Sequence, residues 1–158
     1  MERVSLLVDV QNVYYTTKQA YGRHFDYNKF WAMATRDRQV VRALAYAIDR
    51  GDARQQQFQR ILKAIGFEIK LKPFIQRSDG SAKGDWDVGI ALDAIELAEQ
   101  SDTIVLVSGD GDFDLLAHRI STRYGTRVEA YGVDSLTAAS LKKAVSEFVP
   151  IDNNLLLD

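Results

Sequence analysis

The sequence contains no cysteine and only two histidines, His24 and His118, among its 158 residues. Without cysteine the chain has no disulfide, no thiol nucleophile and no thiolate metal site. Two isolated histidines argue against a zinc site built on histidine and against a Ser-His-Asp triad. Disulfide bonds and cysteine-based catalysis or metal binding are therefore excluded, and histidine-based catalysis is not expected.

A strong excess of charge of either sign is also missing. Lysine and arginine number 20 against 22 acidic residues, so the net charge is -2 and the pI is about 5.7. Without a global basic field, tight non-specific binding of long nucleic acid is not expected, and a polyanion would need a local patch or metal ions. No apolar run is long enough for a membrane span, and the N-terminus lacks a signal-peptide layout. We expect a soluble, cytoplasmic protein without a membrane partner.

Apolar residues make up 46% of the chain, which is enough for the core of one domain of this length. No repeat, low-complexity tract or linker divides the sequence. We therefore expect a single domain over residues 1–158, with a core of about 4–151 and a short tail, 152–158. The tail carries a leucine triplet, which could dock on its own domain or on a second copy in a homodimer.

Segments typical of strands alternate with segments typical of helices. This alternation predicts an α/β fold, with a mostly parallel sheet covered by helices on both faces. Ligands of such sheets bind at the carboxyl edge of the strands. The expected strands are 4–10, 40–48, 67–74, 103–107 and 127–131, with a short addition at "FVPI"; the expected helices are 28–36 capped by Asp26, 53–65, 86–99, 113–124 and 135–145 capped by Ser135; residues 76–84 are expected to form a polar loop.

Four aspartates far apart in the sequence are expected at this carboxyl edge. Asp9 ends the first strand, Asp87 begins the helix after the third, and Asp110 and Asp112 follow the fourth. Two carboxylates about 4 Å apart repel by roughly 4 kcal/mol at an effective dielectric near 20, so the cluster needs protons or a cation. Carboxylate ligands without histidine or thiolate suit Mg²⁺ or Mn²⁺. Phosphodiester hydrolysis is a typical reaction of such metal sites.

Three further residues could assist at this edge. Asn12, one helical turn beyond Asp9, could orient a metal-bound water or a phosphate. Ser108 could hydrogen-bond an aspartate or a phosphate. Lys83, in the loop before Asp87, could neutralise a phosphate.

Structural roles compete with these functional ones. Asp112 could cap the helix that starts at Phe113, Asn12 could be a helix cap, and Asp114 is better explained as a first-turn helix acid. The glycines on both sides of Asp110 are interpreted as backbone freedom. Aromatic and basic residues interleave in "VYYTTKQAYGRHFDYNKFW" and could stack on single-stranded RNA, but we favour a core role for the aromatics. The residues of that segment in question are Tyr14, Tyr15, Lys18, Tyr21, Arg23 and His24.

The spacing of residues around Asp110 and Asp9 does not fit the common calcium-binding, nucleotide-binding or phosphatase motifs. An EF-hand loop starting at Asp110 needs glycine at its sixth position and glutamate at its twelfth, where Leu115 and Ser121 stand. The chain has no P-loop and no G-x-G-x-x-G fingerprint. A D-x-D phosphatase would need an acid where Gln11 stands.

Three segments, "LLVDVQNVYY", "KGDWDVGIALDAI" and "VSGDGDFDLLAHRI", together resemble the NYN domain, in the LabA-like branch of the PIN-like nuclease superfamily. The resemblance extends from Val4 to about Ile151. It implies a three-layer α/β/α fold with strand order 3-2-1-4-5, a divalent metal held by acids at the carboxyl edge, and often ribonuclease activity. Carried over by position, the acidic site would be Asp9, Asp87, Asp110 and Asp112, accompanied by Asn12.

One feature departs from the family pattern. Many relatives read K-G-x-D, whereas here both Asp85 and Trp86 separate Gly84 from Asp87. Asp85 could therefore fill the second acidic position and is otherwise a helix cap. We favour Asp87, because "DVGIALDA" follows it in register.

The sequence thus predicts a metal-dependent phosphodiesterase, a ribonuclease acting on RNA that we expect to be single-stranded, with Mg²⁺ or Mn²⁺ as cofactor. A non-catalytic RNA-binding or regulatory module that keeps the nuclease fold is the alternative. A small-molecule phosphohydrolase is a third hypothesis.

Overall fold

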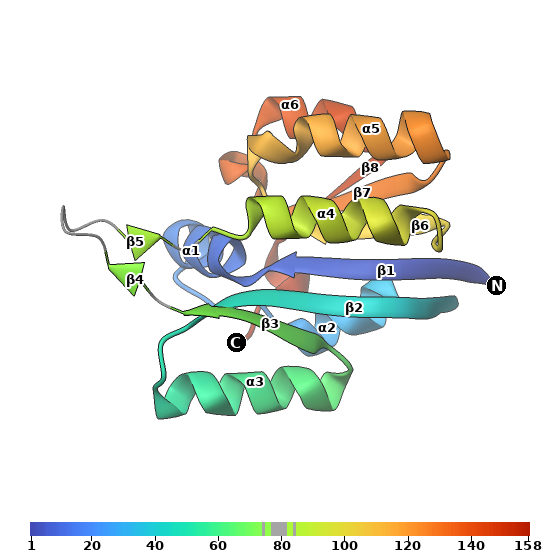
Figure 1. The fold of residues 1–158 in the computed structure, drawn as a ribbon. Coiled ribbons are helices and arrows are strands. Elements are labelled where there is room, and N and C mark those ends of the chain that lie inside the picture. Colours follow the sequence, from blue (N-terminus) through green and yellow to red (C-terminus); the bar gives the residue numbers. More distant parts are fainter. Residues whose placement is uncertain (74, 77–81, 84) are drawn as a thin grey trace.

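A six-stranded parallel sheet forms the middle layer of the computed structural model, which describes residues 1–73, 75–76, 82–83 and 85–158 (Figure 1). The strands lie in the order β3-β2-β1-β6-β7-β8, and each neighbouring pair is parallel. The predicted order 3-2-1-4-5 is confirmed, and "FVPI" contributes the sixth strand. The strands are β1 Glu2–Asp9, β2 Arg38–Asp49, β3 Glu68–Pro73, β6 Thr103–Val107, β7 Arg127–Gly132 and β8 Glu147–Pro150.

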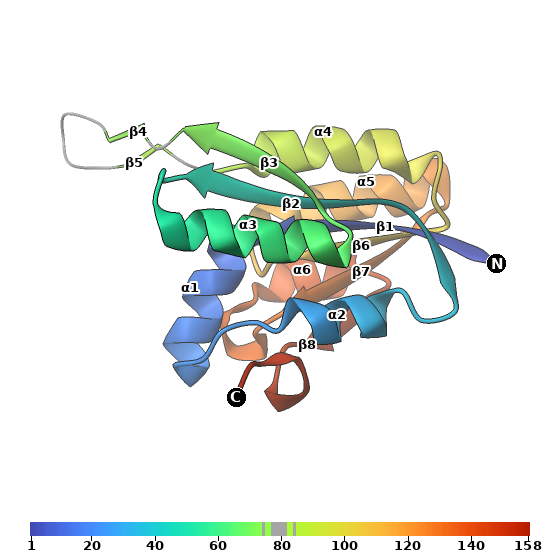
Figure 2. The same cartoon turned by 90° about the horizontal axis from the view of Figure 1, so that it is seen from below.

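Helices cover both faces of the sheet and complete the predicted three layers (Figures 1 and 2). Along β1, Leu6 and Val8 pack into the core on one face and Leu7 packs into the core on the other. Because alternate side chains of a strand point to opposite faces, burial of both faces explains the unbroken apolar run "LLV" in the second half of this strand. The helices of one face are α1 Val10–Tyr21, α2 Tyr27–Ala34 and α3 Ala53–Ile65, and those of the other are α4 Asp87–Ala98, α5 Asp114–Tyr124 and α6 Ala139–Ala144.

Helix α1 is absent from the helices predicted from the sequence. Asp9 is its N-cap, and Gly22 ends it in the left-handed conformation. Only Val13 and Thr17 of this helix are buried, whereas Tyr14 and Tyr15 are 41% and 51% exposed. The expectation that these tyrosines belong to the core is therefore wrong. The helix begins at the carboxyl edge of the sheet and lies against it along only a narrow stripe.

The helix predicted over 135–145 is wrong in its first half. A 3-10 turn, η2, occupies Asp134–Leu136, and α6 begins only at Ala139, so Ser135 is not a helix cap. Between them Thr137 is extended, and its hydroxyl donates to the carbonyl of Val133 at 2.7 Å. Tertiary contacts of this segment with the loop after β6 decide where the helix starts.

A short antiparallel hairpin stands where the sequence predicted a polar loop. Its strands are β4 Ile75–Gln76 and β5 Ala82–Lys83. The hairpin extends beyond the carboxyl end of β3 (Figure 1). The predicted loop residues 77–81 and 84, and residue 74 of the predicted third strand, lie outside the described residues.

The C-terminal tail docks on its own domain. Leu155 and Leu156 are buried, and Leu156 forms an antiparallel bridge with Phe25. The backbone N–H of Asp26 donates to the carbonyl of Leu155 at 2.8 Å. Of the two alternatives for the leucine triplet, docking within the chain is the one found. A homodimer stays a prediction, and light scattering tests it.

No helix within the described ranges combines the length and the apolar character that crossing a bilayer would require.

Replacing Leu156 by alanine is expected to lower the free energy of unfolding by about 2–5 kcal/mol, the usual cost of truncating a buried leucine. Urea unfolding measures the change. Leu157→Ala is the matched control, because Leu157 is 47% exposed, and its effect should stay within about 0.5 kcal/mol. Equal stability of the two variants would show that the tail is not part of the core.

Candidate metal centre

Neighbouring strands bring Asp9 and Ser108 together. β1 and β6 are adjacent, with Val8 opposite Val107, so the next residue of each strand reaches the same edge. Asp9 is only 8% exposed and Ser108 is fully buried. The Ser108 hydroxyl donates to Asp9 Oδ2 at 3.4 Å and accepts from the backbone N–H of Asp110 at 3.2 Å. Ser108 therefore links the acid of one strand to the acidic loop that follows the other.

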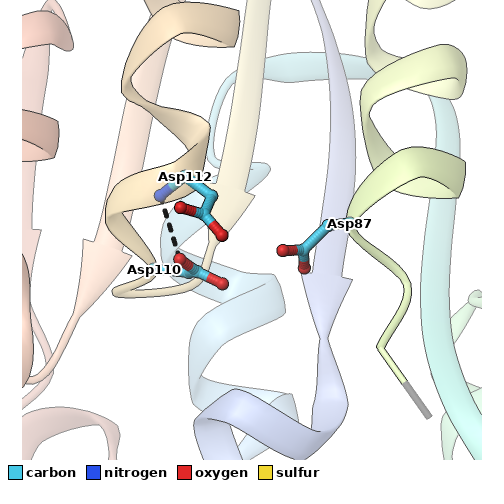
Figure 3. A group of neighbouring side chains, drawn as sticks. All are labelled: Asp87, Asp110 and Asp112. Atoms are coloured by element: carbon cyan, nitrogen blue, oxygen red, sulfur yellow. Dashed lines mark hydrogen bonds between the residues drawn. The ribbon is translucent and has the colours of Figure 1, made fainter. Parts of the chain in front are cut away.

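The acidic loop folds into a 3-10 turn, η1, over Gly111–Phe113. Asp110 is its N-cap, and its Oδ1 accepts from the backbone N–H of Asp112 at 2.9 Å (Figure 3). The expectation that Asp112 caps a helix from Phe113 is wrong, because Asp110 is the capping residue and α5 begins at Asp114. Capping leaves the second oxygen of Asp110 and the whole Asp112 carboxylate for other contacts.

The glycines on either side of Asp110 provide space rather than backbone freedom. Neither has a positive φ. A Cβ at Gly109 would lie 3.0 Å from the carbonyl oxygen of Leu136, and one at Gly111 would lie 2.8 Å from the Cβ of Ala138. The interpretation of these glycines as freedom is therefore wrong: the loop packs too tightly against the η2–α6 segment for any side chain.

Gly111→Ala is expected to destabilise the fold by about 1–3 kcal/mol, because the new methyl group collides with Ala138. Displacement of the loop should also weaken Mn²⁺ binding, measured by calorimetry, by about tenfold. The double variant Gly111→Ala/Ala138→Gly removes the collision and should recover part of both losses. A double variant no better than the single one would show that the collision with Ala138 is not the cause.

Trp86 fixes the position of Asp87. Its indole N–H donates to the carbonyl of Ala47 at 2.9 Å, and its ring packs against Tyr46 at 5.3 Å between centroids. A Cβ at Gly89 would lie 2.6 Å from this ring, so the helix leaves space for it. Trp86 was predicted as the first residue of the helix 86–99 and as one of two residues that separate Gly84 from Asp87, without this anchoring role; Gly89, three positions later, is the sequence signal for it. Trp86 thereby anchors the first turn of α4, where Asp87 stands.

Three carboxylates from two elements converge. Asp87, Asp110 and Asp112 each offer one oxygen, and these oxygens all lie within 4.8 Å of one another. They face each other near the carboxyl end of β1 (Figure 3). Asp9 and Asp85 are not members of this group. Asp85 is exposed, and its Oδ1 accepts from the backbone N–H of Asp87 at 3.3 Å, so the geometry favours Asp87 over Asp85 for the second acidic position.

The electrostatic environment raises the pKa of two acids at this edge, Asp87 and Asp9. Burial, followed by the like charges of Asp110, Asp85 and Asp9, raises the pKa of Asp87 to about 7. Burial raises the pKa of Asp9 to about 6; hydrogen bonds from Asn12 and Ser108 oppose the rise, and the charges of Asp110 and Asp85 add to it. The clustered negative charge is therefore costly in the absence of a cation.

The donor set fits a hard divalent cation. In the part of the chain that the structure describes, Asp9, Asp87, Asp110 and Asp112 form no ion pair. Each donor is a carboxylate oxygen, the ligand type that Mg²⁺ and Mn²⁺ prefer. Asp87, Asp110 and Asp112 could hold such an ion directly.

The accompanying residues differ in what they contact. Asn12 Oδ1 accepts from the backbone N–H of Gly109 at 3.0 Å, so α1 is tied to the acidic loop. The backbone N–H of Asn12 donates to Asp9 at 3.4 Å. Lys83 belongs to β5, but its side chain lies outside the described part. Asn12 thus helps to position the loop that carries Asp110.

Comparisons with known proteins identify the family and the fold of the chain. The model of the NYN domain matches residues 3–152 and confirms the resemblance. The chain is 26% identical to "Low amplitude and bright protein LabA" of Synechococcus elongatus, over 96% of this chain and 84% of that protein. The crystal structure of a protein of unknown function from Vibrio parahaemolyticus has 57% identity and a TM-score of 0.94, over 99% of this chain and 96% of that one. The crystal structure of Acinetobacter baumannii MurG has 15% identity and a TM-score of 0.52, over 100% of this chain and 44% of that one, and this similarity concerns only the fold.

Proposed function

The chain belongs to the NYN-domain family, and from this premise we propose that it is a metal-dependent phosphodiesterase that cleaves RNA. The observation that carries the proposal is the convergence of Asp87, Asp110 and Asp112, with oxygens within 4.8 Å, at the carboxyl edge of the sheet. Ligands of parallel α/β sheets bind at this edge. A polyanionic substrate could not approach so acidic a site without a cation.

The acids have distinct roles in this proposal. Asp87, Asp110 and Asp112 hold Mg²⁺ or Mn²⁺, and the buried Asp9 completes the negative site beside them. The cation supplies activation of water and neutralises charge on the phosphate oxygens. Ser108, being fully buried, acts on the aspartates and not on the substrate. Lys83, on the hairpin at the same edge, neutralises an RNA phosphate, and Asn12 keeps the acidic loop in place.

A cleavage assay with matched substrates tests the proposal. The purified chain is incubated in EDTA, Mg²⁺ or Mn²⁺ with a labelled single-stranded RNA, the same sequence as DNA, and bis(p-nitrophenyl) phosphate. We expect RNA cleavage that depends on the metal and stops in EDTA. Hydrolysis of only the small diester would favour a small-molecule phosphohydrolase. RNA binding without cleavage in any metal would favour the non-catalytic RNA-binding module.

A further inference from the structure

A cavity of about 720 Å³ opens at the same sheet edge as the acids, between α1 and the start of α3. Two of its lining residues, Val10 and Gln11, directly follow Asp9, and two others, Ala47 and Ile48, come from the carboxyl end of β2. Its volume is within the range of pockets that bind small ligands. The cavity therefore opens at the same carboxyl edge as the acidic centre, on the face of the sheet that α1 and α3 cover.

Basic side chains stand among the mostly apolar residues that line this cavity. Lys18, His24, Arg50 and Arg54 line it, and no aspartate or glutamate is among its described lining residues. The chain as a whole has a net charge of -2, so this acid-free wall is a local concentration of positive charge. Among described residues, Lys18 and Arg54 form no ion pair. The cavity thus has the local basic patch that a polyanion requires in a protein without a global basic field.

Exposed aromatic side chains also line this cavity. Tyr14 stacks on His24 with centroids 5.6 Å apart and an angle of 18°, and Lys18 Nζ lies 5.6 Å from the Tyr14 centroid. Tyr15 meets Tyr14 edge-on at 5.4 Å and is 51% exposed. Half of the Tyr15 surface is exposed, so a nucleotide base can stack on this ring while nearby cations bind phosphates.

We infer that this cavity, with Tyr15, Lys18 and Arg54 on its walls, binds a nucleotide of single-stranded RNA next to the phosphodiester at the acidic centre. The inference rests on the proposed function and names how the substrate is held. Burial, and to a lesser extent the charge of Asp9, raises the pKa of the Tyr27 hydroxyl on the cavity wall. Asp9 is thus near the cavity wall, although it is not one of the three acids that converge. Arg54, which the sequence analysis did not single out, follows a strand end at the carboxyl edge, and that position was the available signal.

Binding without turnover tests the inference. Fluorescence anisotropy in EDTA measures the Kd of the full chain for a labelled eight-nucleotide oligouridylate. Tyr15→Ala is expected to weaken binding by roughly five- to hundredfold, the usual range for loss of one base stack. Lys18→Gln/Arg54→Gln should weaken it further at low salt and reduce the slope of log K against log salt by about 1.4. Tyr124→Ala on α5 and Lys63→Gln on α3 are matched controls outside the cavity and should leave Kd within about twofold.

The outcomes separate this inference from the proposed function. Unchanged Kd and salt slope in the cavity variants would overturn the inference, and so would an equal loss in the controls. RNA cleavage whose KM is unaffected by the cavity variants would overturn the inference while the proposed function stands. Oligonucleotide binding that depends on the cavity, in a wild-type chain that cleaves nothing, would support the inference while the proposed function fails.

Discussion

Asp110→Asn is expected to reduce metal-dependent RNA cleavage by a factor on the order of a thousand, because a metal ligand is worth several kcal/mol of transition-state stabilisation. The fold should survive. Asparagine is as good an N-cap as aspartate, so the hydrogen bond to the backbone N–H of Asp112 can persist. Single-turnover cleavage measures the loss of activity. The rise in Tm on adding Mn²⁺, which should disappear in the variant, measures the loss of the metal.

Asp114→Asn is the matched control for this prediction. It removes the same charge from the same segment, but Asp114 is not among the three acids that converge, and its Oδ1 accepts from the backbone N–H of Leu115. Its cleavage rate and its Mn²⁺-induced change in Tm should remain close to those of the wild type. Cleavage by Asp110→Asn within a few-fold of wild type, or an equal loss in both variants, would contradict the assignment of Asp110 as a metal ligand.

The metal-free protein is expected to lose stability from Asp9 and Asp87 as the pH rises from about 4 to 8. Their pKa values are raised from 3.8 to about 6 and about 7 by burial and then by neighbouring acids. Between these values the folded chain holds protons that the unfolded chain has released, so the free energy of unfolding falls with rising pH. The shift of the buried Asp9 corresponds to at most about 3 kcal/mol, at 1.36 kcal/mol per pH unit.

The Asp9→Asn variant isolates this contribution. Urea unfolding in EDTA should find it up to about 3 kcal/mol more stable than wild type at pH 8, and close to wild type near pH 3, below both pKa values, where Asp9 is mostly protonated in the folded and the unfolded chain. Asp114→Asn, the same substitution outside the cluster, should show no such pH-dependent difference. A constant difference between Asp9→Asn and wild type across this range would contradict the origin of the pKa rise in burial and like charge.

The affinity for a metal ion, unlike the stability of the metal-free protein, should increase as the pH rises. Because a carboxylate must lose its proton before it binds a cation, Mn²⁺ affinity should fall as the pH drops below about 7, where Asp87 takes up a proton. Each proton displaced by the metal changes Kd by about tenfold per pH unit well below the pKa. The Mn²⁺-induced rise in Tm, followed from pH 8 to pH 5, measures this change, and an equal rise at both ends would contradict it.

Local patterns in the sequence were enough to locate most of the sheet. The strand predicted over 103–107 is found with the same bounds, because a short apolar run has few alternatives when both faces are buried. The helix over 53–65 is also found with its predicted bounds, since Gly66 ends it. By contrast, α6 starts late because tertiary contacts decide where it begins. Helix α1 was not predicted because only Val13 and Thr17 of it are buried, which leaves little apolar periodicity to detect.

For the site, the sequence by itself determined that Asp9, Asp110 and Asp112 reach one edge, because parallel strands joined by crossover helices present their carboxyl ends together. Only the tertiary structure decided which acids meet. It favours Asp87 over Asp85 because Trp86 is anchored on Ala47 and so sets the first turn of α4. It assigns the cap to Asp110 and requires glycine beside it because another segment packs within 3.0 Å. These outcomes depend on contacts between segments distant in sequence, which local patterns do not specify.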